Sequence, residues 1–286
     1  MMLELLLSTL RLSTPLLLAA LGGLVCETAG VVNIALEGMM LVGAWGAAVG
    51  ALSTHSPMLG LLLGMLVACV TSALYGVCVL HLRANQIVAG MAINMLALGI
   101  TPVLCKVFYD VTGSTPAIPM NERFHNGPVV VAWALLLLIW LVRGKTRFGL
   151  RLIFAGENPE ALEAAGVSVL RIRWTAILLS GAFAGMAGAS LSIYLSSFFS
   201  RNMTAGRGFI ALAALIFGKW RPLPTAAACL LFGLADAAQI RLQGLTIGQV
   251  PIPIQLIQIL PYLVTVVVLA GFVGRSRSPK ALGTPF

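Results

Sequence analysis

Long stretches without charge run through this chain and decide what it can fold into. Between residues 38 and 80 there is no acid or base apart from His55. A helix needs roughly 20 apolar residues to cross the hydrocarbon core of a bilayer. This run is long enough for two such helices, hinged at residues 53–57. It predicts an integral membrane protein.

The composition supports this prediction. Hydrophobic residues make up 59% of the chain and charged residues 9%, with a mean hydropathy of +0.99, whereas soluble domains carry about 25% charge. The net charge is +9, but the basic residues lie between apolar runs, so we expect no nucleic-acid binding. The five cysteines lie in apolar stretches without a CxxC pair and indicate neither disulfides nor a metal site.

Acids and bases divide the chain into about eight or nine membrane segments of an all-α polytopic protein. At least two are too short to cross a membrane alone. The N-terminal one is kept as a membrane element because it opens with Glu4 and lacks the basic start of a secretory signal. The segments are residues 12–26, 38–80 (two spans), 84–105, 124–142, 174–200, 208–218, 222–235 and 242–274.

Positive charge predicts the orientation of these segments. We place residues 81–85, 143–173, 219–221 and the C-terminal tail on the cytoplasmic side, which then holds 12 of the 18 Lys and Arg residues. Alternation of the segments puts the N-terminus outside and the C-terminus inside.

A nonapeptide recurs in the two halves of the chain. Residues 28–36 read TAGVVNIAL and residues 204–212 read TAGRGFIAL, identical at six of nine positions. The helices before the two copies are expected to run in opposite directions. Inverted repeats with broken half-helices are typical of transporters; the alternative is two similar loop-to-helix transitions without a functional meaning. We expect one transmembrane domain over 1–286, with a first repeat at about 12–142, a loop at 143–173 and a second repeat at about 174–274.

Nothing in the sequence indicates catalysis. His55, His81 and His125 are too far apart to suggest a metal site. Residues 144–146, GKT, look like the end of a P-loop, but Ile139 stands where that motif requires glycine. Any ATPase is therefore expected to be a separate subunit.

The 143–173 loop contains a short helix, expected over 157–165. Asn158 is a good N-cap, Pro159 fits the first helical position, and Gly166 ends the helix. Such well-defined ends on a short exposed helix favour docking to another protein, with four arginines flanking it; the alternative is a surface helix near anionic head groups. The four are Arg147, Arg151, Arg171 and Arg173.

These loop residues carry a resemblance. TRFGLR at 146–151, GENPEA at 156–161 and AAG at 164–166 resemble the cytoplasmic loop of ABC importer permeases of the ribose/branched-chain amino acid group. The most similar branch is the nucleoside permeases that work with basic-membrane-lipoprotein-type binding proteins. GVVNIALEGMM at 30–40, ANQIVAG at 84–90 and the stretch 203–218 resemble the same family.

The resemblance implies a non-enzymatic permease subunit of an ATP-driven importer in the bacterial inner membrane, the shorter of two permease types. Its partners would be a second, longer permease, a cytoplasmic ATP-binding subunit and an extracytoplasmic substrate-binding lipoprotein, and it would bind no cofactor itself. Nucleosides are the expected solute. Simple sugars, branched-chain amino acids or a stand-alone proton-coupled carrier stay open. The residues expected to couple to the ATPase are Glu157, Asn158, Pro159, Glu160, Glu163 and Gly166.

Polar residues at membrane depth are costly unless they pair or line water, so they are candidates for the substrate pathway. Asn33 and Glu37 lie one helical turn apart after the first copy of the repeat. Asn33 could instead cap that helix. The amide of Asn94 suits a nucleobase or ribose hydroxyl, or equally an interhelical hydrogen bond.

The second half of the chain supplies three further pathway candidates. Arg207 is expected to pair with Glu37 or Asp236 across the repeat. Phe209 could stack with a base, although core packing is the alternative.

Overall fold

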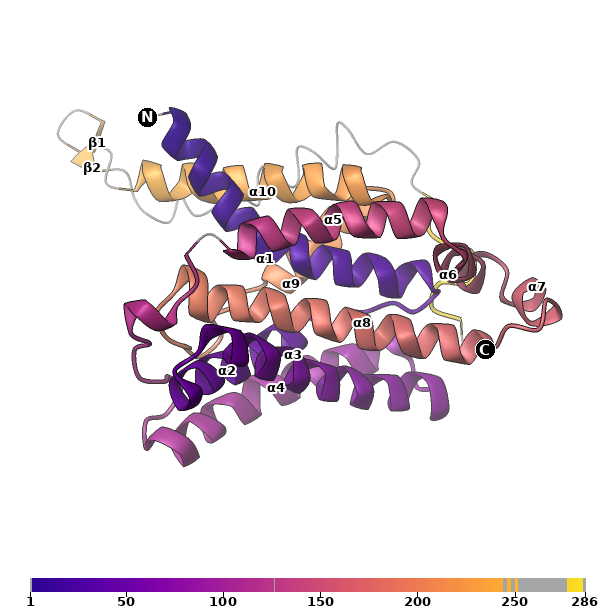
Figure 1. Ribbon diagram of the computed structural model, residues 1–286, viewed down its shortest axis with the longest axis horizontal. Coiled ribbons are helices and arrows are strands. Elements are labelled where there is room, and N and C mark those ends of the chain that lie inside the picture. The colour runs from indigo at the N-terminus through magenta and orange to yellow at the C-terminus, as the bar shows by residue number, and fades with distance from the viewer. Residues whose placement is uncertain (1, 126, 244–245, 248–249, 252–276, 285–286) are drawn as a thin grey trace.

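The computed structural model describes residues 2–125, 127–243, 246–247, 250–251 and 277–284. Within them the chain is a bundle of long helices (Figure 1). The one ladder there pairs β1 (Thr246–Ile247) with β2 (Val250–Pro251). Apart from this short ladder, the elements of the described residues are helices, so the expectation of an all-helical bundle holds there. Most of the last expected segment, 242–274, lies outside the described residues.

Seven helical spans among the described residues are long and apolar enough to cross a membrane. They contain α1 (Met2–Thr28), α2 (Leu36–Thr54), α3 (Pro57–Gly76, continued by a π-helical turn to His81), α4 (Gln86–Tyr109), α5 (Gly127–Lys145), α8 (Val169–Ala189, continued by a π-helical turn to Leu195) and α10 (Pro222–Leu242). Shorter helices are α6 (Arg147–Glu157), α7 (Pro159–Ala164), α9 (Arg207–Phe217) and a 3-10 turn at Met120–Glu122.

Two spans are longer than expected. The sequence limited them to 12–26 and 222–235 because charged residues stand beyond those limits, but α1 has 27 residues and α10 has 21. The charges do not end the helices: Arg241 Nη2 of α10 lies 3.1 Å from Glu4 Oε2 of α1. Both helices extend past their apolar portions, and the ion pair joins their extended ends.

The expectation of a half-helix after each copy of the repeat is correct only for the second copy. There α9 has 11 residues and ends at Phe217. Lys219 and Trp220, which follow, have φ of 52° and 54°. These left-handed residues stop the helix. After the first copy α2 continues for 19 residues.

Glycine contacts hold α2, α3 and α8 together. A Cβ on Gly60 of α3 would lie 2.7 Å from the carbonyl oxygen of Ala47, and one on Gly185 of α8 would lie 2.7 Å from the Cα of Met65. Glycines spaced four residues apart in the sequence, at Gly60/Gly64 and Gly181/Gly185, predict close helix contacts, and the structure confirms this prediction. Such close backbone approach is typical of membrane helices.

The four segments expected on the cytoplasmic side lie together at one end of the bundle, hereafter the α7 end (right in Figure 1). The ring centroid of His81 is 5.6 Å from that of Trp174 near the start of α8, and Arg143 Nη1 donates to the carbonyl oxygen of Trp220. The N–H of Ala281 in the tail donates to the carbonyl oxygen of Gly156 at 2.8 Å. The start of α1 lies at the opposite end.

Candidate functional site

The two copies of the repeated nonapeptide both turn at a glycine, although residues 31–33 are non-helical after the first glycine and α9 begins at Arg207 directly after the second. Gly30 and Gly206, at the third position of each copy, have φ of 89° and 84°. Only glycine adopts this region without steric cost. The preceding helices are antiparallel, since Gly22 of α1 packs on Ser180 and Phe183 of α8 while Gly30 lies beside Arg173 near the start of α8. The two turns therefore approach the interior from opposite directions.

The carboxylate of Glu37 connects the two halves. Its Oε1 accepts a hydrogen bond from the N–H of Gly206 at 2.8 Å, and its Oε2 accepts one from the N–H of Gly208 at 2.6 Å. These groups lie at the N-terminus of α9, where a negative charge is favoured by the helix dipole. Glu37 is 5% exposed. It thus holds the start of α9 against α2.

A second carboxylate, which the sequence analysis did not select, holds the other end of α9. Glu27 Oε2 accepts a hydrogen bond from Trp220 Nε1 at 2.6 Å, and Glu27 is buried. The signal was available: Glu27 is an acid between the apolar first segment, which ends at residue 26, and the first copy of the repeat. With Glu37 at one end and Glu27 at the other, α9 is fixed between two buried acids of the first half.

Asn33 and Asn94 are buried and bonded within the protein. Asn33 Nδ2 donates to Ser180 Oγ at 2.8 Å, so it contacts α8 and does not cap α2. Asn94 of α4 accepts from the N–H of Gly38 at 2.8 Å and donates to the carbonyl oxygen of Ile34 at 2.9 Å. The amide of Asn94 therefore makes the interhelical contact that the sequence left as an alternative.

Arg207, Phe209 and Asp236 lie closer to the surface. Phe209 is 42% exposed, and Arg207 and Asp236 are half-buried. Arg207 Nη1 donates to the carbonyl oxygen of Met203 at 3.2 Å, while the carboxylate of Glu37 takes the backbone N–H groups. Arg207 therefore does not pair with Glu37, while its expected pairing with Asp236 stays a prediction. These three residues belong to the accessible face of α9 and α10.

The short helix of the 143–173 loop forms with the expected caps. Asn158 Oδ1 accepts from the N–H of Ala161 at 3.1 Å, Pro159 is the first residue of α7, and Gly166 has φ 77°. Leu162 is buried against α6 and α8. Of the six expected coupling residues, Pro159 is half-buried and the remaining five are exposed: Glu157, Asn158, Glu160, Glu163 and Gly166.

The surroundings of α7 differ from the expectation in two respects. An additional helix, α6, precedes it. Arg173, expected to flank the docking surface, is 1% exposed, and its Nη1 donates to the carbonyl oxygen of Thr284 at 2.9 Å. The N–H of Gly283, also in the tail, donates a hydrogen bond to the carbonyl oxygen of Gly30 at 3.0 Å. The tail thus joins α6 to the first turn of the repeat.

Among the described residues, no group of three or more His, Cys, Asp or Glu residues is placed to hold a metal ion. The site consists of the two ends of α9, each hydrogen-bonded to a carboxylate of the first half of the chain. Chemically it can hold a short helix in position and present polar and aromatic groups beside it.

Residues 5–269 match the family described as branched-chain amino acid transport system / permease component. The nucleoside ABC transporter permease protein NupC of Lactococcus lactis subsp. cremoris is 37% identical, over 96% of this chain and 93% of its own. The guanosine ABC transporter permease protein NupQ of Bacillus subtilis is 35% identical, over 98% and 95% of the two chains. The same Bacillus strain has a second match, the guanosine permease protein NupP, 31% identical over 80% of this chain and 72% of its own. No solved structure matches the chain.

Proposed function

The chain belongs to the family of branched-chain amino acid transport system permease components, and on this premise we propose that it is the membrane subunit of an ATP-driven importer for nucleosides. The observation that carries the proposal is the identity of 37% and 35%, across almost the full chain, to a nucleoside and a guanosine permease protein. The chain is a transport subunit and supplies no catalytic group to ATP hydrolysis.

A second permease chain completes the membrane part of this importer. Bacillus subtilis contains two guanosine permease proteins that match this chain to different degrees, which supports pairing of two related permeases. An ATP-binding subunit on the cytoplasmic side and a substrate-binding lipoprotein on the other side are the remaining partners. The location is the inner membrane of a bacterial cell.

The α7 end faces the cytoplasm in this proposal. Within the described part of the chain it gathers segments that hold 11 Lys and Arg residues, and basic loops stay on the cytoplasmic side. In a cysteine-free variant, Ala117→Cys should react with an impermeant thiol reagent from outside, and Ser278→Cys should not. Both positions are exposed. The reverse labelling pattern would contradict the orientation.

The exposed face of α7 docks to the ATP-binding subunit. Its acids Glu160 and Glu163 are exposed while Leu162 anchors the helix, so the acids are free to contact a partner. Glu160→Lys or Glu163→Lys should leave membrane insertion intact and uncouple ATP hydrolysis from uptake, measured in proteoliposomes. As a control, Asn121→Lys places a lysine at an exposed position of the opposite end and should have no effect. Normal uptake and normal ATPase stimulation in the Glu160→Lys and Glu163→Lys variants would make α7 a surface feature only.

The six pathway candidates divide into two roles in this proposal. Arg207, Phe209 and Asp236 face the solute, because their side chains retain access to the surface. Asn33, Glu37 and Asn94 hold the helix ends behind them through the hydrogen bonds already described. The pathway then runs along α9 and α10.

The test is uptake by the reconstituted complex across guanosine, adenosine, uridine, ribose, glucose and leucine. We expect ATP-dependent uptake of nucleosides and competition only among them. Preference for a sugar or for leucine would keep the importer and reject its solute. Uptake that collapses with a protonophore while ATP is maintained, and that Glu37→Gln makes insensitive to pH, would reject the importer in favour of a proton-coupled carrier.

A further inference from the structure

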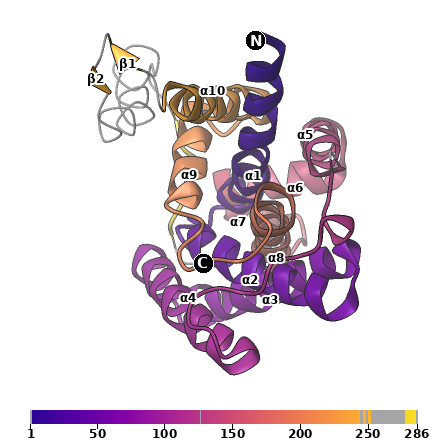
Figure 2. The same ribbon diagram turned by 90° about the vertical axis from the view of Figure 1, so that its left-hand side faces the viewer.

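Helix α5 stands at the edge of the bundle and leaves a gap beside α8. Figure 2 shows α5 at the periphery, to the right of α1. Of its residues only Ala132 and Leu136 are fully buried. A cavity of about 240 Å³ lies between α5, α1, α6 and α8 in the half of the bundle nearer the α7 end. We call it the α5–α8 cleft.

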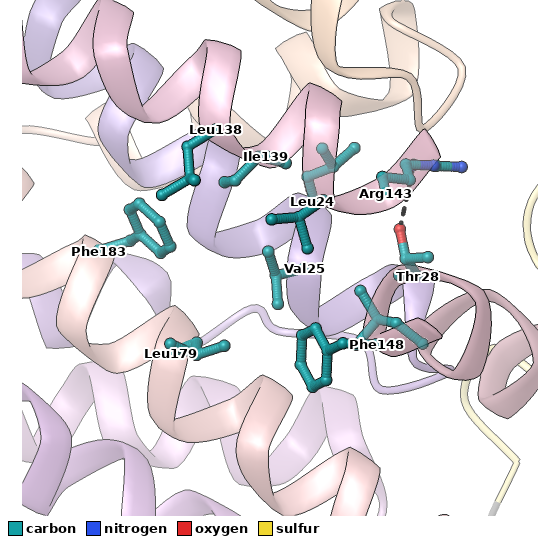
Figure 3. A pocket seen from close by; sticks show the side chains of 12 residues that line it. Leu24, Val25, Thr28, Leu138, Ile139, Arg143, Phe148, Leu179 and Phe183 are labelled. Carbon is teal, nitrogen blue, oxygen red and sulfur yellow. Dashed lines mark hydrogen bonds between the residues drawn. The ribbon is translucent and has the colours of Figure 1, made fainter. Parts of the chain in front are cut away.

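The walls of the cleft are apolar, as Figure 3 shows. Leu24 and Val25 of α1 lie opposite Leu179 and Phe183 of α8. Polar groups occur at one end, where Arg143 Nη1 donates to Thr28 Oγ1 at 3.4 Å. An apolar cavity stays free of water and accepts apolar ligands; one of about 150 Å³ is large enough for benzene. The cleft therefore suits a hydrocarbon chain.

The cleft opens to the surface of the bundle between two apolar helices. Leu138 of α5 and Leu179 of α8, both in its lining, are 52% and 39% exposed. Further along the same seam, a second apolar cavity of about 150 Å³ separates Val131 of α5 from Met186 of α8. The separation of α5 from α8 thus recurs along the bundle.

Basic residues lie beside the cleft at the α7 end. Helix α6 turns Phe148 and Leu152 into the cleft and leaves Arg147 and Arg151 exposed. A helix with one apolar and one basic face lies in the membrane interface and attracts anionic lipid head groups. The charge beside the opening is complementary to a phosphate.

We propose that the α5–α8 cleft binds one anionic phospholipid from the leaflet at the α7 end. One acyl chain lies between α5 and α8 against α1, and the phosphate contacts Arg147 and Arg151 on α6. The lipid fills the space that side chains leave between α5 and α8, and it connects α5 to the helix that precedes α7. This site is independent of the identity of the transported solute.

The test measures lipid retention by the purified transporter complex with native mass spectrometry. The probes are phosphatidylglycerol and phosphatidylcholine with the same palmitoyl and oleoyl chains. We expect phosphatidylglycerol to bind at least five times more tightly. Leu138→Trp fills the cleft and should weaken this binding at least five-fold. Leu137→Trp is the matched control, because Leu137 is the neighbouring leucine, is 56% exposed and lies outside the lining.

The double variant R147Q/R151Q tests the head-group contact. Both side chains are exposed, so the fold should be preserved and the preference for phosphatidylglycerol should disappear. Equal retention of the two lipids by the unchanged protein, or unchanged preference in R147Q/R151Q, would overturn the proposal. A disulfide between the introduced cysteine of L138C and a cysteine of the second permease would also overturn the proposal, because a protein chain would then cover the cleft.

Discussion

The two copies of the repeated nonapeptide share a left-handed glycine and differ in what surrounds it. At the first copy the polar residues are buried: Asn33, Glu37 and Asn94 are 0%, 5% and 4% exposed. At the second copy Phe209 stands at the position of Asn33 and is 42% exposed. Both copies thus turn at a glycine, but the first continues through non-helical, mostly buried residues and serves as a support, whereas the second enters α9 directly and presents an accessible surface.

The largest effect is expected from breaking the contact between the copies. Glu37→Ala leaves the N–H groups of Gly206 and Gly208 without their acceptor in a buried place. A hydrogen bond to a charged group is worth roughly 1.5–3 kcal/mol, so two should lower the free energy of unfolding by about 3 kcal/mol or more. The thermal midpoint of the purified complex measures this loss, and transport should be abolished with it.

A surface acid provides the control for this variant. Glu4→Ala removes the exposed partner of Arg241 and should change the free energy of unfolding by less than about 1 kcal/mol, as is usual for exposed ion pairs. Equal midpoints for Glu37→Ala and Glu4→Ala would mean that the two copies do not depend on the carboxylate.

The sequence predicts the membrane class, most helix positions, the caps of α7 and the contact glycines, because these depend on local patterns. The length of the uncharged apolar runs between acids and bases locates α2 to α5 and α8, and Asn158 with Pro159 locates the start of α7. The grouping of the basic loops at one end also follows from charge alone. These features need no knowledge of which helices are neighbours.

Partner choice within the site depends on tertiary packing and was not predictable. The opposite charges of Glu37 and Arg207 favour an ion pair. In the structure the carboxylate of Glu37 instead accepts hydrogen bonds from two backbone N–H groups at the start of α9. The sequence around Asn94 is equally compatible with a solute contact and with a helix contact. Only the tertiary structure shows that Ile34 and Gly38 are its partners. Arg173 has the sequence context of a surface arginine, but the tail covers it.

A smaller effect should separate the two turns themselves. Ala at either left-handed glycine costs about 1–2 kcal/mol of backbone strain. A Cβ on Gly206 meets no atom within 4 Å, whereas one on Gly30 would lie 3.0 Å from Arg173 Nη2 and 3.2 Å from the carbonyl oxygen of Ala281. Gly30→Ala should therefore lower the thermal midpoint more than Gly206→Ala, because it also displaces the tail.

A helical glycine in open space is the control for both turns. Gly99 lies within α4 and its Cβ would meet no atom within 4 Å, so Gly99→Ala should leave the protein as stable or slightly more stable. If Gly206→Ala proves more damaging than Gly30→Ala, the second turn is the more constrained one, and the contrast between support and surface is reversed.

The smallest effect on stability should come from Phe209, although its effect on transport should be clear. Phe209→Leu keeps an apolar side chain at an exposed position, so the free energy of unfolding should change by less than about 0.5 kcal/mol. Stacking of an aromatic ring on a base is worth roughly 1–3 kcal/mol, so the KM for nucleoside uptake should rise about five-fold or more. Ile216 on the same helix has the same 42% exposure, and Ile216→Leu should leave KM unchanged. If both variants transport nucleosides like the unchanged protein, Phe209 does not contact the solute. The accessible surface of the second copy would then be a helix face without a binding role, and the difference between the copies would be one of packing alone.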